Sequence, residues 1–312
     1  MTSEFRKKLQ SGEIIVFDGA MGTELAARGA TPGAEANVVA PETVLAIHRA
    51  YREAGAEVLM TNTFNTTGVA LIALSGRRRA ADTRAMNKSV SEACALARKA
   101  LGGGGYVAAD LGPTGAMLEP HGMISEEAMR AAFRETARLL AAGGADLFVV
   151  ETMSDAREMT LAVQACRDVA SELPVAASMA FDPSRRGGFR TNMGVPPAEA
   201  ARAMIAAGAD IIGANCGSVT PEQMAEIVRE FRSVTQQHPI LAQPNAGVPE
   251  LQAGKTVFRL APREFADGMK QVLDAGARLV GGCCGTTPEH VRLLRQQVEE
   301  WKAGSAGRKL QS

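Results

Sequence analysis

Short apolar runs alternate with longer stretches of helical spacing along the whole chain. Eight runs rich in Val, Ile, Leu and Ala have the length of strands, and most are separated by segments with apolar residues at helical intervals. The expected strands are 14–17, 58–60, 106–109, 147–150, 175–179, 211–212, 240–242 and 279–280, and clear helical stretches are 41–54, 125–142 and 221–236. This alternation predicts parallel strands joined by crossover helices.

A recurring phrase, small residue–Gly–Ala followed by a polar residue, marks the passage from a helix to the next strand. It occurs at 54–57, 143–146, 207–210 and 275–278, and glycine just past a helix end is typical of such connections. Eight strand–helix units predict a single-domain α/β protein, a closed (β/α)8 TIM barrel, over residues 1–303, followed by a flexible tail over 304–312. An open doubly wound sheet is the alternative, but residues 18–22 lack its nucleotide-binding glycine pattern.

Composition and charge narrow the classes of partner. Lys plus Arg equals Asp plus Glu at 34 each, whereas nucleic-acid binders usually carry a basic surplus. The one basic cluster, at 77–79, is expected at the solvated start of a helix. No run approaches the roughly 18 apolar residues of a membrane span, and no signal peptide is evident. Five cysteines, an odd number, suit a reducing compartment. We therefore expect a cytoplasmic protein with neither nucleic acid nor membrane as partner.

Polar residues follow the predicted strands, where barrels of this kind gather their chemistry. They are Asp18 and Gly19 after the first strand, Thr61 and Asn62 after the second, Asp110 after the third, Glu151 after the fourth and Asn215 after the sixth. Six of these residues, all except Asp110, are the candidates for binding a substrate.

Three cysteines stand at the ends of strands six and eight. Cys216 lies in Gly-Ala-Asn-Cys-Gly, and Cys283 and Cys284 lie in Gly-Gly-Cys-Cys-Gly. Adjacent cysteines seldom form a disulfide with each other, and flanking glycines allow a bend that would turn both thiols toward one point. Three converging thiolates form a zinc ligand set with a fourth position open. The alternative is three small core cysteines, the interpretation we favour for Cys94 and Cys166. The four histidines are not expected to be ligands.

The charge of a zinc ion with three thiolate ligands indicates which substrate would bind to it. Zinc with three thiolates has a formal charge of −1, which suits an incoming thiol better than water, and coordination would bind that thiol as thiolate near neutral pH. Asp18 and Glu151 are placed to hold an ammonium group, and backbone amides of glycine-rich turns could take a carboxylate. The sequence therefore predicts a thiol amino acid as substrate.

Seven segments carry a family resemblance, at 18–23, 61–64, 112–115, 151–152, 213–217, 244–247 and 281–286. In this order they resemble the homocysteine S-methyltransferases, and most closely the homocysteine-binding barrel of cobalamin-dependent methionine synthase. The resemblance implies a (β/α)8 barrel, zinc held by Cys216, Cys283 and Cys284, and homocysteine bound through its sulfur, with its amino group near Asp18 and Glu151. The zinc-bound thiolate would be the nucleophile, methionine the product, and no separate acid or base residue is assigned.

The methyl donor is left open by this resemblance. The folate, cobalamin and reactivation modules of the large synthase have no counterpart in the 312 residues, and donors across the family are methylcobalamin, glycine betaine and S-methylmethionine. Cationic donors favour aromatic walls, yet only Phe64 and Phe181 lie near the expected mouth. We therefore expect methylcobalamin on a corrinoid partner protein. The alternative is a standalone enzyme that uses betaine or S-methylmethionine.

Two other classes compete. A non-catalytic barrel could bind zinc and homocysteine to deliver or sense the amino acid. An unrelated barrel enzyme, such as a lyase, would predict a Schiff-base lysine or a phosphate site at the strand ends, and no lysine occurs at any of them.

Overall fold

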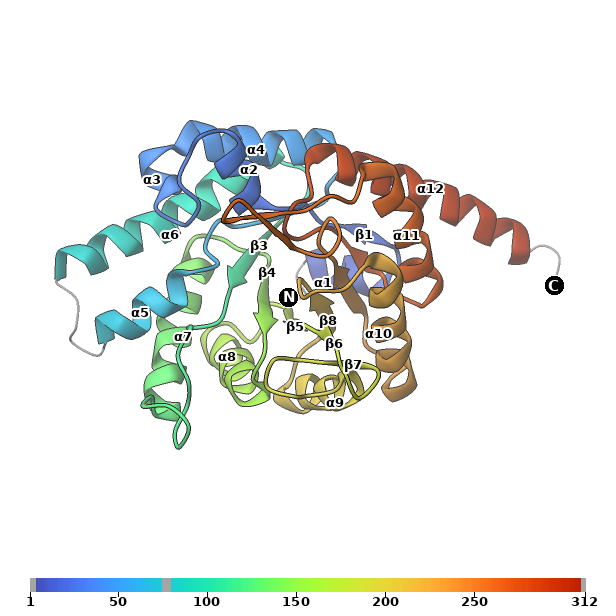
Figure 1. Ribbon diagram of the computed structural model, residues 1–312. Coiled ribbons are helices and arrows are strands. Elements are labelled where there is room, and N and C mark those ends of the chain that lie inside the picture. Colours follow the sequence, from blue (N-terminus) through green and yellow to red (C-terminus); the bar gives the residue numbers. More distant parts are fainter. Residues whose placement is uncertain (1–3, 75–79, 310–312) are drawn as a thin grey trace.

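The computed structural model describes residues 4–74 and 80–309 and is a (β/α)8 barrel, as the sequence predicts. Eight parallel strands pair in the order β1-β12-β9-β8-β5-β4-β3-β2, and a bridge between Phe17 and Val58 links β1 to β2. Helices surround the strands in the nearly end-on view of Figure 1. The barrel strands are β1 (Ile15–Val16), β2 (Val58–Met60), β3 (Tyr106–Leu111), β4 (Leu147–Met153), β5 (Val175–Met179), β8 (Ile211–Asn215), β9 (Ile240–Gln243) and β12 (Leu279–Val280). This closure excludes the open doubly wound sheet.

Helices alternate with the barrel strands, and three of them fall on the helical stretches expected at 41–54, 125–142 and 221–236. They are α1 (Glu4–Gln10), α2 (Met21–Ala27), α3 (Ala36–Val39), α4 (Pro41–Glu53), α5 (Thr66–Leu74), α6 (Ala80–Leu101), α7 (Glu126–Ala142), α8 (Ala156–Val169), α9 (Pro197–Ala207), α10 (Pro221–Val234), α11 (Pro262–Asp274) and α12 (Pro288–Lys309). Side-chain caps fix the first residues of two of these helices. Ser125 accepts a hydrogen bond from the Ala128 amide and caps α7, and Thr220 forms a capping box with Gln223 before Pro221 opens α10.

Two predictions, the flexible tail at 304–312 and the helix start at 77–79, concern residues that the structure describes only in part or not at all. Helix α12 continues to Lys309, so the barrel's last helix crosses the boundary expected at residue 304. The flexibility of 304–312 stays a prediction, and residues 310–312 lie outside the described part of the chain. The arginines at 77–79 lie outside it as well.

Side-chain alternation along the strands separates the barrel interior from the layer under the helices. The interior cluster is Ile15, Phe17, Val58, Ala108, Leu147, Val149, Ala176, Ile211, Leu241 and Leu279. Because side chains in a strand alternate with period two, the next inward positions are Met60, Asp110, Glu151, Ser178 and Gln243, and in β8 Gly213 precedes the inward position of Asn215. The apolar filling therefore gives way to polar side chains at the carboxyl ends of the strands.

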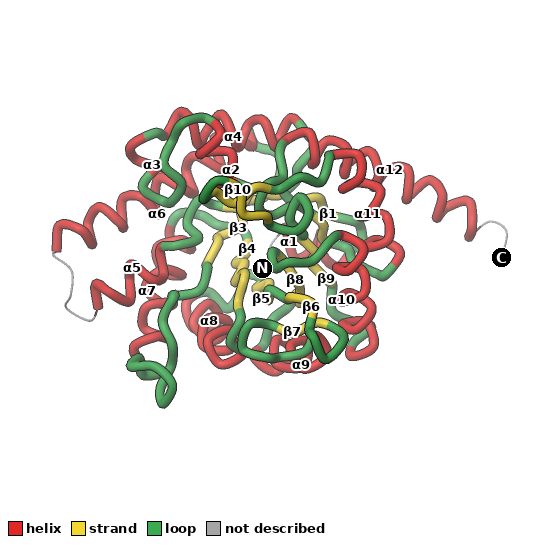
Figure 2. The backbone as a smooth tube through the Cα atoms, viewed as in Figure 1, coloured by secondary structure: helices red, strands yellow, loops and turns green. Residues whose placement is uncertain are grey.

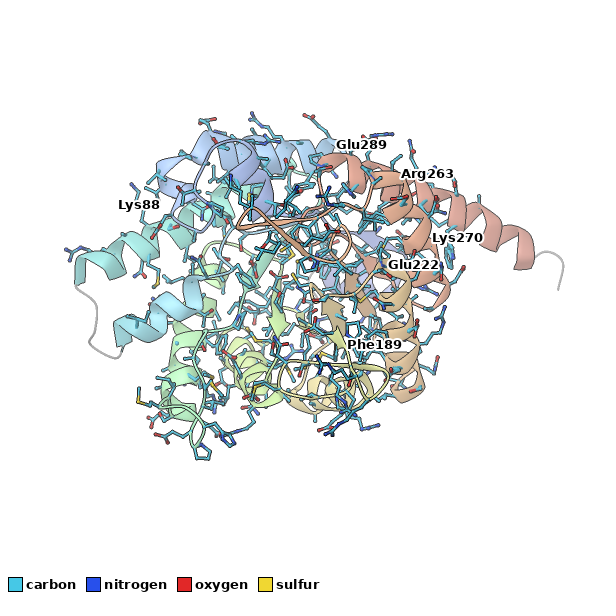
Figure 3. All side chains as sticks on the ribbon, in the orientation of Figure 1. Lys88, Phe189, Glu222, Arg263, Lys270 and Glu289 are labelled. Carbon is cyan, nitrogen blue, oxygen red and sulfur yellow. The ribbon has the colours of Figure 1, made fainter. Side chains whose placement is uncertain are left out.

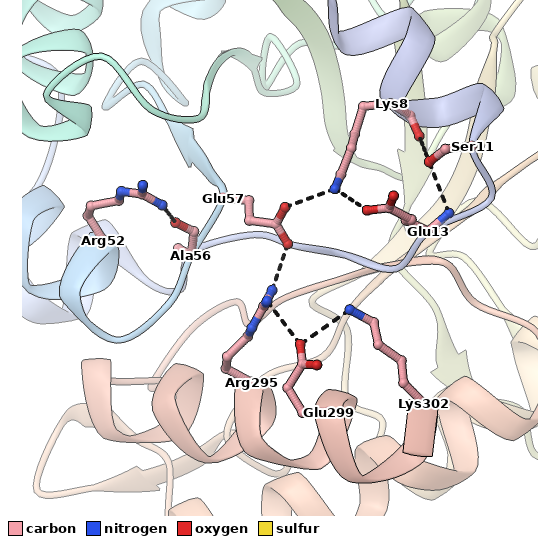
Figure 4. Close-up of polar contacts among 9 residues, drawn as sticks. All are labelled: Lys8, Ser11, Glu13, Arg52, Ala56, Glu57, Arg295, Glu299 and Lys302. Atoms are coloured by element: carbon pink, nitrogen blue, oxygen red, sulfur yellow. Dashed lines mark hydrogen bonds and ion pairs between the residues drawn. The ribbon is translucent and has the colours of Figure 1, made fainter. Parts of the chain in front are cut away.

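Helix α1 closes the opposite end of the barrel. Its buried Phe5 joins the interior cluster and meets the Tyr106 ring edge-on, with centroids 5.0 Å apart. Around this plug, Glu57 pairs with Lys8 of α1 at 3.4 Å and with Arg295 of α12 at 2.7 Å, a network drawn in Figure 4. Such partly exposed pairs contribute about 0–1 kcal/mol each, so burial of Phe5 is the main attachment of α1.

Two small hairpins lie in loops that follow barrel strands. They are β6 (Asp182–Pro183) with β7 (Phe189–Arg190), and β10 (Glu250–Gln252) with β11 (Lys255–Val257). Figure 2 shows these loops crossing the barrel end. On the outer helices, the labelled side chains of Lys88, Arg263 and Lys270 are exposed (Figure 3). Within the described residues, no helix combines the length and apolarity that a membrane span requires.

Candidate metal and substrate site

The three cysteines at the strand ends meet. Cys216 directly follows β8, whereas Cys283 and Cys284 follow β12, and the three Sγ atoms lie within 4.8 Å of one another. The Cys216 Sγ is 3.8 Å from that of Cys284 and 2.6 Å from that of Cys283. All three are partly exposed and line one cavity, while Cys94 and Cys166 are buried in helices. The core alternative therefore holds only for the latter two.

Backbone conformation brings the thiols together. Cys216 has φ 53° and the following Gly217 has φ 69°, a region that glycine enters readily but other residues seldom do. A Cβ on Gly217 would lie 2.1 Å from the carbonyl oxygen of Phe181, and one on Gly282 would lie 2.4 Å from Thr286 Oγ1. The flanking glycines thus serve both the turn and the close approach, although the left-handed conformation also extends to Cys216 itself.

The donor set fits a thiophilic metal. In a tetrahedral zinc site with bonds of about 2.3 Å, two sulfurs lie about 3.8 Å apart, the separation of the Cys216 and Cys284 Sγ atoms. The closer pair, Cys216 and Cys283, would have to open by about 1 Å. A hydrogen bond with Cys216 raises the pKa of Cys283, and hydrogen bonds from both neighbours lower the pKa of Cys284 to about 3. Alone, the cluster therefore favours one thiolate, and further ionisation calls for a cation.

A cavity of about 310 Å³ extends from the cysteines over the carboxyl ends of the strands. Its lining includes Asp18, Gly19, Ala20, Met21, Gly22, Thr23, Met60, Thr61, Asn62, Phe64, Asp110, Glu151, Thr152, Gln243 and the three cysteines. Five of the six residues expected to bind substrate line it. No lysine or arginine is among its described lining residues.

Three carboxyl groups lie in this cavity, and burial raises the pKa of each. Asp18, Asp110 and Glu151 are 2%, 4% and 8% exposed. Desolvation raises the pKa of Glu151 to about 8 and moves the pKa of the two aspartates well above their usual range. Asp18 Oδ2 accepts a hydrogen bond from the Met60 amide at 2.9 Å. Such a group of enclosed carboxyls favours a cationic ligand, since a cation restores their ionised form.

Asn215 is engaged in hydrogen bonds with neighbouring residues of the protein. Its Oδ1 accepts hydrogen bonds from the Thr152 amide at 2.9 Å and Ser178 Oγ at 2.6 Å, and its Nδ2 donates to Glu151 Oε2 at 3.0 Å. The residue is fully buried and does not line the cavity. It also secures Thr152 at φ 58°, a costly conformation for a β-branched residue. Asn215 therefore contacts Glu151 from outside the cavity lining, and its contact with a substrate stays a prediction.

Thr61 and Asn62 stabilise the cavity walls. Thr61 Oγ1 accepts a hydrogen bond from the Asp110 amide at 3.0 Å, and Asn62 Nδ2 donates to the Gly33 carbonyl at 2.9 Å. The sequence analysis named Asp110 only as a strand end and did not name Gln243, yet both line the cavity. Their inward register, two residues beyond Ala108 and Leu241, is the signal that would have identified them.

The chain matches a known family over most of its length. The family described as homocysteine S-methyltransferase matches residues 15–298. Methionine synthase of Mycobacterium tuberculosis is 33% identical over 311 residues, which cover 94% of this chain and 25% of that protein. The S-methylmethionine–homocysteine S-methyltransferase of Mus musculus is 30% identical over 312 residues, which cover 94% of this chain and 80% of that protein. The chain thus spans about a quarter of the methionine synthase relatives.

A solved structure agrees with this match. The metallated form of the homocysteine methyltransferase MmuM from Escherichia coli superposes with a TM-score of 0.73 and 25% sequence identity, covering 94% of this chain and 99% of that one.

Proposed function

Because this chain belongs to the homocysteine S-methyltransferase family, we propose that it transfers a methyl group to the thiol of homocysteine and releases methionine. One observation carries the proposal: a cluster of three thiols and a group of buried carboxyls share one cavity that no lysine or arginine lines in the described residues. The two ends complement a thiol and an ammonium group, the two groups that distinguish homocysteine.

Cys216, Cys283 and Cys284 would hold a zinc ion in this proposal. When bound, zinc would lower the pKa of the substrate thiol and keep it as a nucleophilic thiolate. The cysteines' partial exposure leaves the cluster open to the cavity for a fourth ligand. No separate acid or base is required of the chain, because the thiol loses its proton on binding and the methyl group transfers as a carbon electrophile.

The remaining polar groups would orient the amino acid. Asp18 and Glu151 accept hydrogen bonds from its ammonium group, and the backbone amides at the start of α2, at Met21 and Gly22, lie in the cavity wall where they could take its carboxylate. Gly19 in the same wall packs closely against the protein behind it, since a Cβ there would lie 2.6 Å from Thr286 Oγ1.

A methyl-corrinoid protein docked over the cavity is the donor we propose. Phe64 is the single aromatic residue among the described lining, so a cationic donor lacks the π faces that favour it. Except for Ile72 in α5, the exposed large apolar side chains of the described residues lie in the segments that connect a barrel strand to the long helix after it, with Val38 and Val39 in the short helix α3 and Leu251 in the hairpin strand β10. They are Val38, Val39, Phe64, Met117, Met123, Met193, Val248 and Leu251. This apolar rim favours a macromolecular partner at the mouth.

A standalone enzyme that uses a small methyl donor is the second candidate, and the share of two such relatives' lengths that this chain covers supports it. The chain spans 80% of the mouse S-methylmethionine–homocysteine enzyme and 74% of mouse betaine–homocysteine S-methyltransferase 1, which is 28% identical.

Zinc content and donor-dependent turnover test both candidates. We expect about one zinc per chain, and we would compare methionine formation from homocysteine with methylcobalamin, betaine and S-methylmethionine. Turnover with betaine or S-methylmethionine alone would establish the standalone enzyme. Zinc and homocysteine binding without turnover on small donors, followed by turnover when a methyl-corrinoid protein is added, would support the partner. Binding without turnover on any donor would favour the non-catalytic barrel, and absence of zinc would contradict the proposal.

A further inference from the structure

Three acceptor atoms in the cavity lack a hydrogen-bond partner within the described part of the chain. They are Asp18 Oδ1, Asp110 Oδ1 and Gln243 Oε1, and all three residues line the same 310 Å³ space. They come from the end of β1, from β3 and from β9, three different positions around the barrel. Buried acceptors are almost always satisfied, so three unpaired ones in one cavity indicate a ligand with several donors.

The side chains that carry these atoms also contact other groups of the protein. The Met60 amide donates to Asp18 Oδ2, and Gln243 Nε2 contacts Met60 Sδ at 3.5 Å. The Asp110 carboxyl interacts with that of Glu151. Asp18 and Gln243 each have one polar atom engaged with the protein, while the partnerless atom is buried in a residue of the cavity lining. The open acceptors are therefore anchored, and a ligand would not have to order them.

A primary ammonium group matches this arrangement. It carries three N–H donors and no acceptor, and it brings the positive charge that buried carboxyls lack here. A secondary amide or a des-amino ligand would bring one donor or none. It would leave at least two buried acceptors unpaired, an arrangement that discriminates strongly against the poorer ligand.

We propose that Asp110 is a specificity-determining residue that accepts a hydrogen bond from the substrate's ammonium group alongside Asp18 and Glu151, so that the site selects thiol amino acids with a free α-amino group. The inference rests on the proposed function and adds a third carboxyl to the amino subsite. Because the ammonium group has three N–H donors, Gln243 Oε1 would share one of them with a neighbouring carboxylate.

A purely structural role is the competing explanation, because Asp110 contacts Glu151 and could act only by holding that carboxyl in place. The two roles separate when the ligand is varied along with the residue. A contact with the ammonium group matters only for ligands that have one, whereas a general disturbance of the cavity weakens every ligand.

The experiment measures binding of methionine and of 4-(methylthio)butanoate, which is methionine without its amino group, by calorimetry on the zinc-loaded protein. Wild type is compared with Asp110→Leu, which puts two methyl groups in place of the two carboxylate oxygens, and with Asp110→Asn, which keeps the volume and one oxygen but no charge. The matched control is Glu158→Gln, which alters a buried carboxyl of α8 outside the cavity lining.

We expect Asp110→Leu to weaken methionine roughly ten- to a hundred-fold, the effect of losing a hydrogen bond to a charged group. Its affinity for 4-(methylthio)butanoate should stay within about two-fold, and Asp110→Asn should show the same selectivity with a smaller loss. Equal losses for both ligands, or no loss for methionine, would overturn the role of Asp110 alone. Failure of the wild-type protein to bind methionine and homocysteine would overturn the proposed function as well.

Discussion

Replacing Glu151 by Gln should stabilise the protein while weakening its substrate binding. The carboxyl is buried, accepts a hydrogen bond from Asn215, and has a pKa raised by burial to about 8 from the usual 4.5. Gln keeps the shape and presents an oxygen to Asn215 and an N–H to Asp110. The variant therefore removes an ionisable group with little change in packing.

The magnitude follows from the proton that Glu151 takes up on folding. Below about pH 4.5 the group is protonated in both the folded and unfolded states, so it adds no pH-dependent cost. Between pH 4.5 and about 8 the unfolded chain ionises while the folded one holds its proton, so wild-type stability falls as pH rises. At pH 7 the difference is about 2.5 pH units, or roughly 3 kcal/mol. Glu151→Gln removes this cost.

Urea unfolding at pH 5 and pH 7.5, without homocysteine, measures this effect. The stability advantage of the variant should be small at pH 5 and grow by about 2–3 kcal/mol at pH 7.5. Glu127→Gln, at an exposed carboxyl in the first turn of α7, is the control and should show no such growth. An advantage independent of pH would refute the reasoning.

Homocysteine binding by the same variant should weaken roughly ten- to a hundred-fold, because a charge-assisted hydrogen bond to the ammonium group is lost. Calorimetry on the zinc-loaded protein measures it. Unchanged affinity would remove Glu151 from the amino subsite. A gain in stability together with a loss of binding is the usual relation between the two at a functional site.

Three further substitutions probe the metal cluster and the barrel. Alanine at any one of the three clustered cysteines should lower bound zinc, measured by metal analysis, well below one per chain. The circular dichroism spectrum should not change, because the cluster lies at the rim of the barrel. Global unfolding on metal removal would instead make the metal structural. Gly217→Ala places a Cβ 2.1 Å from the Phe181 carbonyl at φ 69° and should reduce both stability and zinc affinity, a result that normal zinc titration would contradict. Phe5→Ala should lower the free energy of unfolding, measured in urea, by about 3–5 kcal/mol. Zinc content should stay unchanged, because Phe5 lies at the opposite end of the barrel. Loss of zinc would show that the two ends are coupled.

The sequence predicted the barrel because each strand is a continuous apolar run between helices. The bounds of β2, β5 and β12 match the expected ranges. Elements whose stability depends on tertiary contacts were missed. Helix α1 has only seven residues and is held chiefly by Phe5, and the hairpins β6–β7 and β10–β11 are two- and three-residue ladders within loops.

Only the part of the site that depends on local sequence could be predicted. Residue type and position after a strand identified the cysteines, Asp18 and Glu151, since these follow from the chain alone. Whether a strand-end residue faces the cavity or lies behind it depends on register, so Gln243 was overlooked. Cys216 has a left-handed conformation and donates its amide to the Gln243 carbonyl on the neighbouring strand β9, and no local sequence pattern encodes this combination.

The plug at the N-terminal end of the barrel also constrains the order of events in a catalytic cycle. Phe5 and the apolar interior fill the barrel beneath the cavity, so both reactants must enter through the rim at the carboxyl ends of the strands. A donor seated over that rim covers the entrance, so homocysteine has to arrive first. By the same geometry the demethylated donor leaves before methionine does. Steady-state kinetics should then be ordered, with methionine, the last species to depart, competing with homocysteine for the free enzyme.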